Sequence, residues 1–197
     1  MNMERFEQQV KFILELDKEK NIRRQTHLTG HGRRENDAEH AWHLAAMTWL
    51  LSEYANEKFD VAKTMLMVLL HDVVEIDAGD SYAYDAQAQQ TAHERELAAA
   101  ERLYHILPED QGTYLENLWK EFEEGKTAEA RFAHVMDNFQ PLLLNDSNGG
   151  EDWKEHGIAR SQVEKRNLHT AEGSAWIWDY MKSIIDRNVE KGSLKSE

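Results

Sequence analysis

The segment MLMVLLHDVVEIDAGD, residues 65–80, ends an apolar run with a histidine and an aspartate, His71 and Asp72. A nearly continuous apolar run is typical of a buried helix. Ionisable side chains at the end of such a helix cost several kcal/mol unless they are paired, hydrogen-bonded or bound to an ion. Imidazole and carboxylate groups are both ligands of divalent metals. The segment therefore predicts a central helix that carries two metal ligands at its end.

The residues after the doublet extend this prediction. Neighbouring helical residues point about 100° apart, so His71 and Asp72 reach one ion only near a helix end. Glu75 lies four residues after His71 and three after Asp72, on the same helical face. A carboxylate there is suited to orienting or deprotonating a bound water. Asp80 follows Gly79 and is expected to act with Glu75. Either acid could instead be a plain helix-end or turn carboxylate.

Two other segments offer further ligands. His40 stands in NDAEHAWH, residues 36–43, close to a helix start expected at Asn36 or Asp37. His43 lies three residues later and can share that face. Either histidine could instead be a hydrogen-bonded core or surface residue.

Asp137 lies in ARFAHVMDNFQP, residues 130–141, among large apolar side chains that are unfavourable for an unpaired carboxylate. Pro141 has no N–H to bond the carbonyl of Asp137, so a kink is expected beside the carboxylate. The alternative is an aspartate on the polar face of a kinked helix.

Composition limits the class of protein. The chain has 197 residues, 41% of them hydrophobic, with two prolines and no cysteine. Without cysteine, a metal must be held by histidine and carboxylate groups. The net charge of −14 argues against a nucleic-acid polymer as partner. No apolar run is long enough for a membrane span and the N-terminus has no signal-peptide pattern, so we expect no membrane partner and a cytoplasmic location.

Helical periodicity dominates the chain. We expect helices over residues 4–16, from about 37 to 54, from Asp60 through the doublet, over 86–107, 108–122 and 127–139, and from about 161 onward. Residues 22–36 and 145–157 are expected to be loops, and no strand alternation is present. These features predict an all-α fold with one domain over residues 1–197. The core is expected to contain Trp42, Trp49, Met65 and Met67.

Three segments together resemble the HD-domain superfamily of metal-dependent phosphohydrolases. They are RRENDAEHAWHLA (33–45), LLHDVVEIDAGDSYAYD (69–85) and ARFAHVMDNFQPLLLN (130–145). The resemblance covers nearly the whole chain and is greatest to the subfamily of bacterial 5′-deoxynucleotidases and HD-domain-containing protein 2. It implies a helical bundle, often a homodimer, that hydrolyses a small phosphorylated substrate.

The resemblance also implies roles for particular residues. One divalent ion, which could be Mn, Co, Fe, Ni, Zn or Mg, would be held by His40, His71, Asp72 and Asp137. Glu75 and Asp80 would position the phosphate and the attacking water. Arginines upstream of His40 would contact the substrate, and the candidates are Arg24, Arg33 and Arg34.

The resemblance further implies hydrolysis of phosphomonoesters, with nucleoside 5′-monophosphates as the expected substrates. Deoxynucleotidases of this family carry a tryptophan beside the substrate arginine. The segment IRRQTHLTG, residues 22–30, has none. The resemblance therefore gives no expectation of selectivity for deoxyribose in this sequence.

Two alternatives stay open. Some HD proteins, including di-iron oxygenases, hold a second ion with histidines between the doublet and the last aspartate, where this chain has His93 and His105. The other alternative is a non-catalytic, metal-stabilised protein that binds a ligand.

Overall fold

The computed structural model describes residues 3–79 and 86–197, with side chains throughout these ranges except residues 86–92. The described residues form helices and one small two-stranded antiparallel sheet. This helical architecture confirms the all-α prediction. None of the described helices combines the length and apolar character that a bilayer-spanning helix needs.

The elements follow one another in a simple order. They are α1 (Met3–Leu16), the 3₁₀ helix η1 (Asp17–Asn21), β1 (Arg23–His27), β2 (Arg34–Asn36), α2 (Asp37–Leu51), the 3₁₀ helix η2 (Ser52–Tyr54), α3 (Val61–Leu70), α4 (Glu75–Ala78), α5 (Ala86–Tyr104), α6 (Glu109–Glu124), α7 (Ala128–Ser147), α8 (Glu151–His156), α9 (Arg160–Arg166), α10 (Thr170–Gly173) and α11 (Ala175–Glu190).

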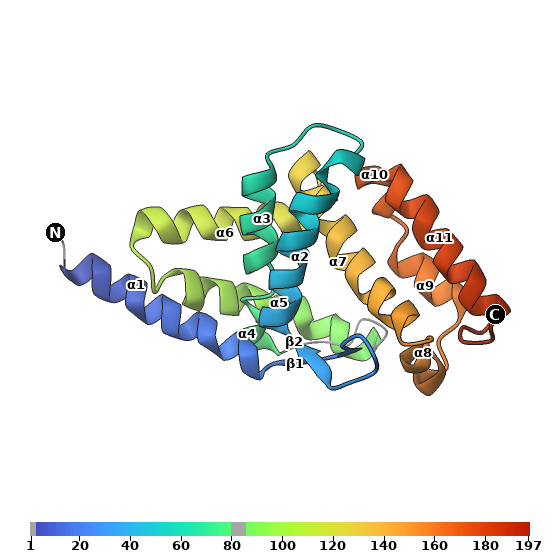
Figure 1. Ribbon diagram of the computed structural model, residues 1–197. Helices are drawn as coiled ribbons and strands as arrows, with labels where there is room; N and C mark the ends of the chain where they lie inside the picture. The colour runs from blue at the N-terminus through green and yellow to red at the C-terminus, as the bar shows by residue number, and fades with distance from the viewer. Residues whose placement is uncertain (1–2, 80–85) are drawn as a thin grey trace.

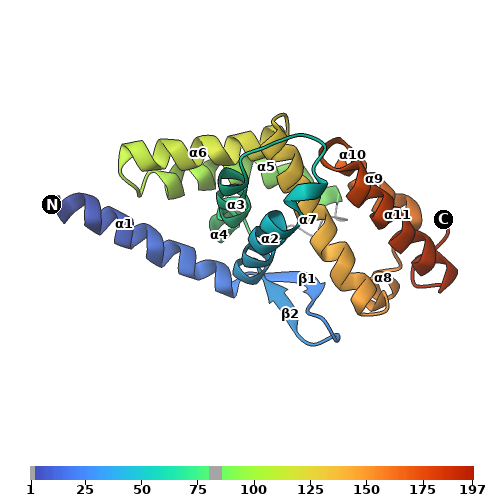
Figure 2. The same cartoon turned by 45° about the horizontal axis from the view of Figure 1, so that its top comes forward.

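Helices α2, α3 and α7 stand in the middle of the molecule (Figure 1). In both views α1 and α6 lie on one side of them, and α9, α10 and α11 on the other (Figures 1 and 2). One apolar core joins the central helices to α11 and includes Leu44, Val68 and Phe132. A smaller core joins α1, α5 and α6 to the chain after α3, and includes Val73 and Leu103. Val68 of the larger core and Val73 of the smaller core flank His71 in the sequence.

The predicted helix starts at Asn36, Asp60 and Thr127 are confirmed. Each of these side chains accepts a hydrogen bond from a backbone N–H in the first turn of α2, α3 or α7. Helix α7 runs through Pro141 without ending there. The expected loop over 145–157 is wrong in part, because α7 continues to Ser147 and α8 occupies Glu151–His156.

The expected loop over residues 22–36 is wrong as well, since it contains the β1–β2 hairpin. Arg23 pairs with Asn36 and His27 with Arg34. The strands read RRQTH and REN, so neither shows the alternation of apolar and polar residues that marks a half-buried strand. Polar side chains on both faces removed the signal that would have predicted this ribbon.

The expectation that Trp42 and Trp49 belong to the core is also wrong. Their exposed fractions are 68% and 64%, whereas Met67 is buried. The buried face of α2 carries Ala41, Leu44, Ala45 and Met47 instead. Helix α2 packs against both α3 and α7. Residue size was therefore a poor guide to which face is buried.

Candidate metal centre

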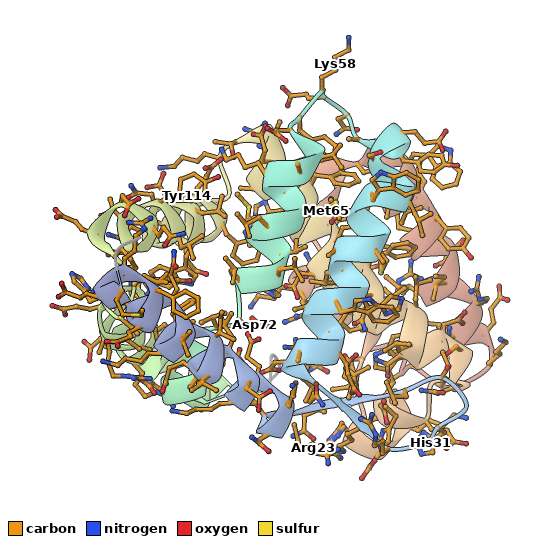
Figure 3. All side chains as sticks on the ribbon, turned by 60° about the vertical axis from the view of Figure 1, so that its left-hand side comes forward. Arg23, His31, Lys58, Met65, Asp72 and Tyr114 are labelled. Atoms are coloured by element: carbon orange, nitrogen blue, oxygen red, sulfur yellow. The ribbon has the colours of Figure 1, made fainter. Side chains whose placement is uncertain are left out.

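The His71–Asp72 doublet lies where α3 ends and the backbone tightens. Helix α3 ends at Leu70, and the next hydrogen bonds span three residues, including one of 2.8 Å from the Glu75 amide to the Asp72 carbonyl. Figure 3 shows Asp72 just below the end of α3. The change of geometry brings His71 Nε2 within 3.1 Å of Asp72 Oδ2. The expected helix end is therefore present at the doublet.

His40 reaches the doublet from the first turn of α2. Asn36 accepts a hydrogen bond from the Glu39 amide, and the Glu39 side chain accepts one from the Asn36 amide. This reciprocal cap fixes the start of the helix. The ring of His40 is fully buried, and its centroid lies 5.6 Å from that of His71.

Asp137 reaches the same point from the middle of α7. Its Oδ1 atom lies 3.1 Å from His40 Nε2 and 3.7 Å from His71 Nε2. Ligand atoms of His40, His71 and Asp72 lie within 4.8 Å of one another. The four residues that the sequence predicted as ligands therefore converge from three helical segments. Their role as ligands stays a prediction.

The hydrogen bonds of the two rings decide which nitrogens face the cluster. His71 Nδ1 donates to the Val68 carbonyl at 2.9 Å, and His40 Nδ1 bonds the side-chain oxygen of Gln140 at 3.1 Å. A carbonyl oxygen can only accept, so the Nδ1 atoms carry the protons and the Nε2 atoms are left for a ligand.

The buried Nε2 atom of His71 has no partner in hydrogen-bond geometry among the described residues. Such an atom facing two carboxylates fits a site for a divalent ion.

Burial and charge oppose each other in this cluster. Burial lowers the pKa of His71, but the charges of Asp72 and Asp137 outweigh it and raise this pKa well above its ordinary value. Burial raises the pKa of Asp137, but the hydrogen bond from His40 and the nearby charges of His71 and His40 lower it well below its ordinary value. The carboxylates thus stay ionised and attract positive charge into a buried place.

A supporting layer was not predicted from the sequence. Gln140 Nε2 donates to Glu35 Oε2 at 2.9 Å, which orients the amide oxygen of Gln140 toward His40. Glu35 and Gln140 are both buried. A signal existed for Gln140, because it follows Asp137 by three residues and shares its helical face. Glu35 had none, since it stands in a charged run at the end of the hairpin.

Arg24 is the candidate arginine that lies at the cluster. Its Nη1 atom donates to Asp72 Oδ2 at 2.7 Å and to Asp37 Oδ1 at 3.2 Å. Its side chain is only 13% exposed, and Asp37 is fully buried. Burial lowers the pKa of Arg24, but neighbouring carboxylates, Asp72 first, outweigh it and raise the pKa. Asp37 was expected only as a helix cap, so its contact with Arg24 was missed.

The other candidate arginines make different contacts. Arg33 forms an exposed ion pair with the capping residue Glu39, and Arg34 bonds Gln25 on the facing strand. The structure does not bring either one to the cluster. Glu75 lies close to it, since oxygens of Asp37, Asp72 and Glu75 are within 4.8 Å of one another. Asp80 lies outside the described residues.

The remaining histidines considered from the sequence do not belong to the group of His40, His71 and Asp72. His43 is half-buried beside Gln140, and burial lowers its pKa. His93 is exposed and groups with Glu96 and Glu123. His105 is exposed, follows the last residue of α5 and bonds the backbone of that helix at Glu101.

Comparison with known proteins agrees with this arrangement. A family model described as HD domain matches residues 16–178, which include the four converging residues. The chain belongs to the HD domain family. The crystal structure of a predicted metal-dependent phosphohydrolase from Magnetospirillum magnetotacticum is similar, with a TM-score of 0.92 and 45% identity over 96% of this chain and 95% of that one.

Other relatives match over a smaller part of the chain or with lower identity. The 5′-deoxynucleotidase HDDC2 of Xenopus laevis is 31% identical over 109 residues, 55% of this chain and 53% of the relative. The human 5′-deoxynucleotidase HDDC2 is 28% identical over 111 residues, 56% and 53%. The chain thus spans about half the length of the curated relatives it matches. A conserved hypothetical protein from Pyrococcus furiosus shares only the fold, with a TM-score of 0.61 and 21% identity over 92% of this chain and 99% of that one.

A buried acid beside the cluster was also missed. Glu19 lies in η1 and is only 6% exposed. Burial, with the negative charges of Asp72 and Asp37, raises the pKa of Glu19 from 4.5 to about 8. The folded chain therefore binds this proton more tightly than the unfolded chain, and stability is lost as the pH rises from 4.5 toward 8.

Replacing Glu19 with glutamine should remove this loss of folding stability at high pH. In chelator-treated protein we expect Glu19→Gln to unfold with the same free energy as wild type near pH 5, and to be more stable by roughly a few kcal/mol near pH 9. Urea titrations across this range measure the difference. Glu7→Gln, at an exposed position on α1, is the control. A Glu19→Gln effect that does not vary with pH would contradict the assignment.

Proposed function

We propose that this chain is a metal-dependent phosphohydrolase that removes phosphate from small phosphate esters, nucleoside 5′-monophosphates foremost. The observation that carries the proposal is the convergence of two imidazoles, two carboxylates and the Arg24 guanidinium at one buried place. The similarity to a predicted metal-dependent phosphohydrolase and to 5′-deoxynucleotidases supports it.

One divalent ion would be held by the Nε2 atoms of His40 and His71 and by the carboxylates of Asp72 and Asp137. Nitrogen and carboxylate donors are compatible with Mn, Co, Fe, Ni, Zn or Mg. When bound, such an ion supplies a Lewis acid that polarises a phosphate oxygen and lowers the pKa of water.

The protein's own groups would supply the rest of the chemistry. Arg24 presents a guanidinium, which suits two-point contact with phosphate and offsets its charge in an acidic chain. Glu75 would take the proton from the attacking water. Asp80 is proposed to assist Glu75.

We further propose the remaining features that the sequence predicted. They are a single domain over residues 1–197, a cytoplasmic location, and the dinuclear and non-catalytic alternatives. His93 is the one candidate for a second ion that gathers carboxylates, Glu96 and Glu123, among the described residues. A metal content of two ions per chain at the cluster of His40, His71, Asp72 and Asp137, called the HD cluster below, would favour the dinuclear form.

We also propose that the chain forms a homodimer through α1. Phe6, Val10 and Ile13 follow the spacing of a helical seam and are 58%, 37% and 61% exposed. Beside them, an apolar groove of about 720 Å³ lies between α1 and α6. Monomers seldom expose a continuous apolar face, and a stripe of this kind fits an identical stripe across a two-fold axis.

The dimer is tested by light scattering at tens of micromolar chain. We expect twice the chain mass for wild type and the monomer mass for Ile13→Lys. Lys11→Arg, on the same helix, is the control. A wild-type monomer would contradict the proposal.

The hydrolysis is tested with a panel of nucleotides and other phosphomonoesters in Mn²⁺, Co²⁺ and Mg²⁺. We expect phosphate release that a chelator abolishes and added metal restores. Asp72→Ala should lower the rate by about two orders of magnitude or more, because the ion loses a ligand. His105→Ala, at an exposed position, should not change it. No release under any condition, or full activity of Asp72→Ala, would refute the proposal.

The role of Arg24 is tested against Arg33. Arg24→Lys keeps the charge but loses the planar fork, so kcat/KM should fall by roughly 10- to 100-fold. Arg33→Lys should be close to wild type, since it can still pair with Glu39. Thermal unfolding of both variants controls for stability. Equal kinetics for the two variants would rule out a direct role for Arg24.

A further inference from the structure

Two histidines at the tip of the hairpin face the first turn of α8. His27 is the last residue of β1, and His31 stands in the turn that follows. Their ring centroids lie 4.4 Å apart. Asp152, from α8, is 6% exposed and lies against them. Figure 3 shows His31 well away from Asp72, and none of these residues belongs to the HD cluster.

The polar atoms of this group converge. His27 Nδ1 lies 2.6 Å from Asp152 Oδ1, and the His27 amide donates to Asp152 Oδ2 at 3.2 Å. His31 Nε2 lies 3.2 Å from a carboxylate oxygen of Glu151. Ligand atoms of His27, His31 and Asp152 lie within 4.8 Å of one another. Tetrahedral zinc with bonds of about 2.0–2.1 Å needs separations of about 3.3 Å, which small side-chain rotations would supply.

The backbone that carries the two histidines is fixed from α7. The Asn148 side chain accepts a hydrogen bond from the His31 amide at 2.7 Å and donates to the His27 carbonyl at 3.2 Å. His31 has a φ of 52°, a left-handed conformation that residues other than glycine seldom adopt. The fixed backbone therefore presents both imidazoles to α8, so little ordering would be needed to bind a ligand.

We propose that His27, His31 and Asp152, with Glu151 as a fourth ligand, form a second site for a divalent cation of the zinc class. Two imidazoles with carboxylates favour Zn²⁺, Co²⁺ or Ni²⁺ over Mg²⁺ or Ca²⁺. The carboxylates of Glu151 and Asp152 balance the charge of such an ion. The ion would join the hairpin to α8 and thereby fix the position of β1. Arg24 lies on this strand, three residues before His27.

The competing explanation is a hydrogen-bonded contact that needs no ion. The test is zinc content per chain, measured by elemental analysis after dialysis against buffered Zn²⁺. His31→Asn removes the imidazole, and asparagine tolerates the left-handed conformation. We expect the His31→Asn variant to bind one zinc ion per chain fewer than its parent, wild type. Added to a second parent, Asp72→Ala, the same substitution should also remove one zinc ion per chain. Using both parents separates this site from the HD cluster, so the result does not depend on the proposed hydrolysis.

His169→Asn is the matched control. His169 pairs with Glu172 at 2.6 Å, but it belongs to no group of three such ligands among the described residues. It should lose no zinc. Should His31→Asn fail to fold by circular dichroism, histidine-ring NMR of the unmodified chain decides, since Zn²⁺ should shift the His27 and His31 signals. Unchanged zinc content in folded His31→Asn, or unmoved ring signals, would overturn the proposal.

Discussion

The burial of ionisable groups between two apolar cores is the constraint on which the rest of this structure depends. His71 is 4% exposed, and the residues around it in the sequence, Val68, Val73 and Val74, are buried. Neither an imidazole nor a carboxylate is stable in such surroundings without a partner. The fold supplies these partners, because α7 and α2 bring Asp137 and His40 to the doublet. Each of these helices is held at its start by a side-chain cap.

The second layer explains how the cluster keeps a defined geometry. Gln140 and Glu35 orient His40, and the Val68 carbonyl orients His71, so both Nε2 atoms face the same place. Arg24 binds Asp72 in the same structure. A phosphate that took over the guanidinium would leave the carboxylate to a cation. In the proposed function, the Arg24 guanidinium would therefore balance the charge of Asp72 in the free chain and that of the phosphate in the complex.

The four clustered residues and the main helices could be predicted from the sequence because each carries a local signal. His71, Asp72 and Asp137 stand out as polar residues in apolar helices, and caps such as Thr127 mark where helices begin. The hairpin could not be predicted, because both of its faces are polar. Nor could Arg24 be separated from Arg33, since the choice depends on which carboxylate, Asp72 or Glu39, each one meets after folding. Trp42 also misled, because the buried face of α2 is the one that carries Leu44 and Met47, and Trp42 is exposed.

The central claim is that one divalent ion binds between His40, His71, Asp72 and Asp137. A crystal structure of the chain loaded with Mn²⁺, with anomalous scattering recorded to identify the ion, tests it most directly. The account predicts one anomalous peak between these four side chains, bonded to both Nε2 atoms and both carboxylates at about 2.0–2.3 Å. Density without an ion at this place, in crystals of protein that turns over substrate with Mn²⁺, would contradict it.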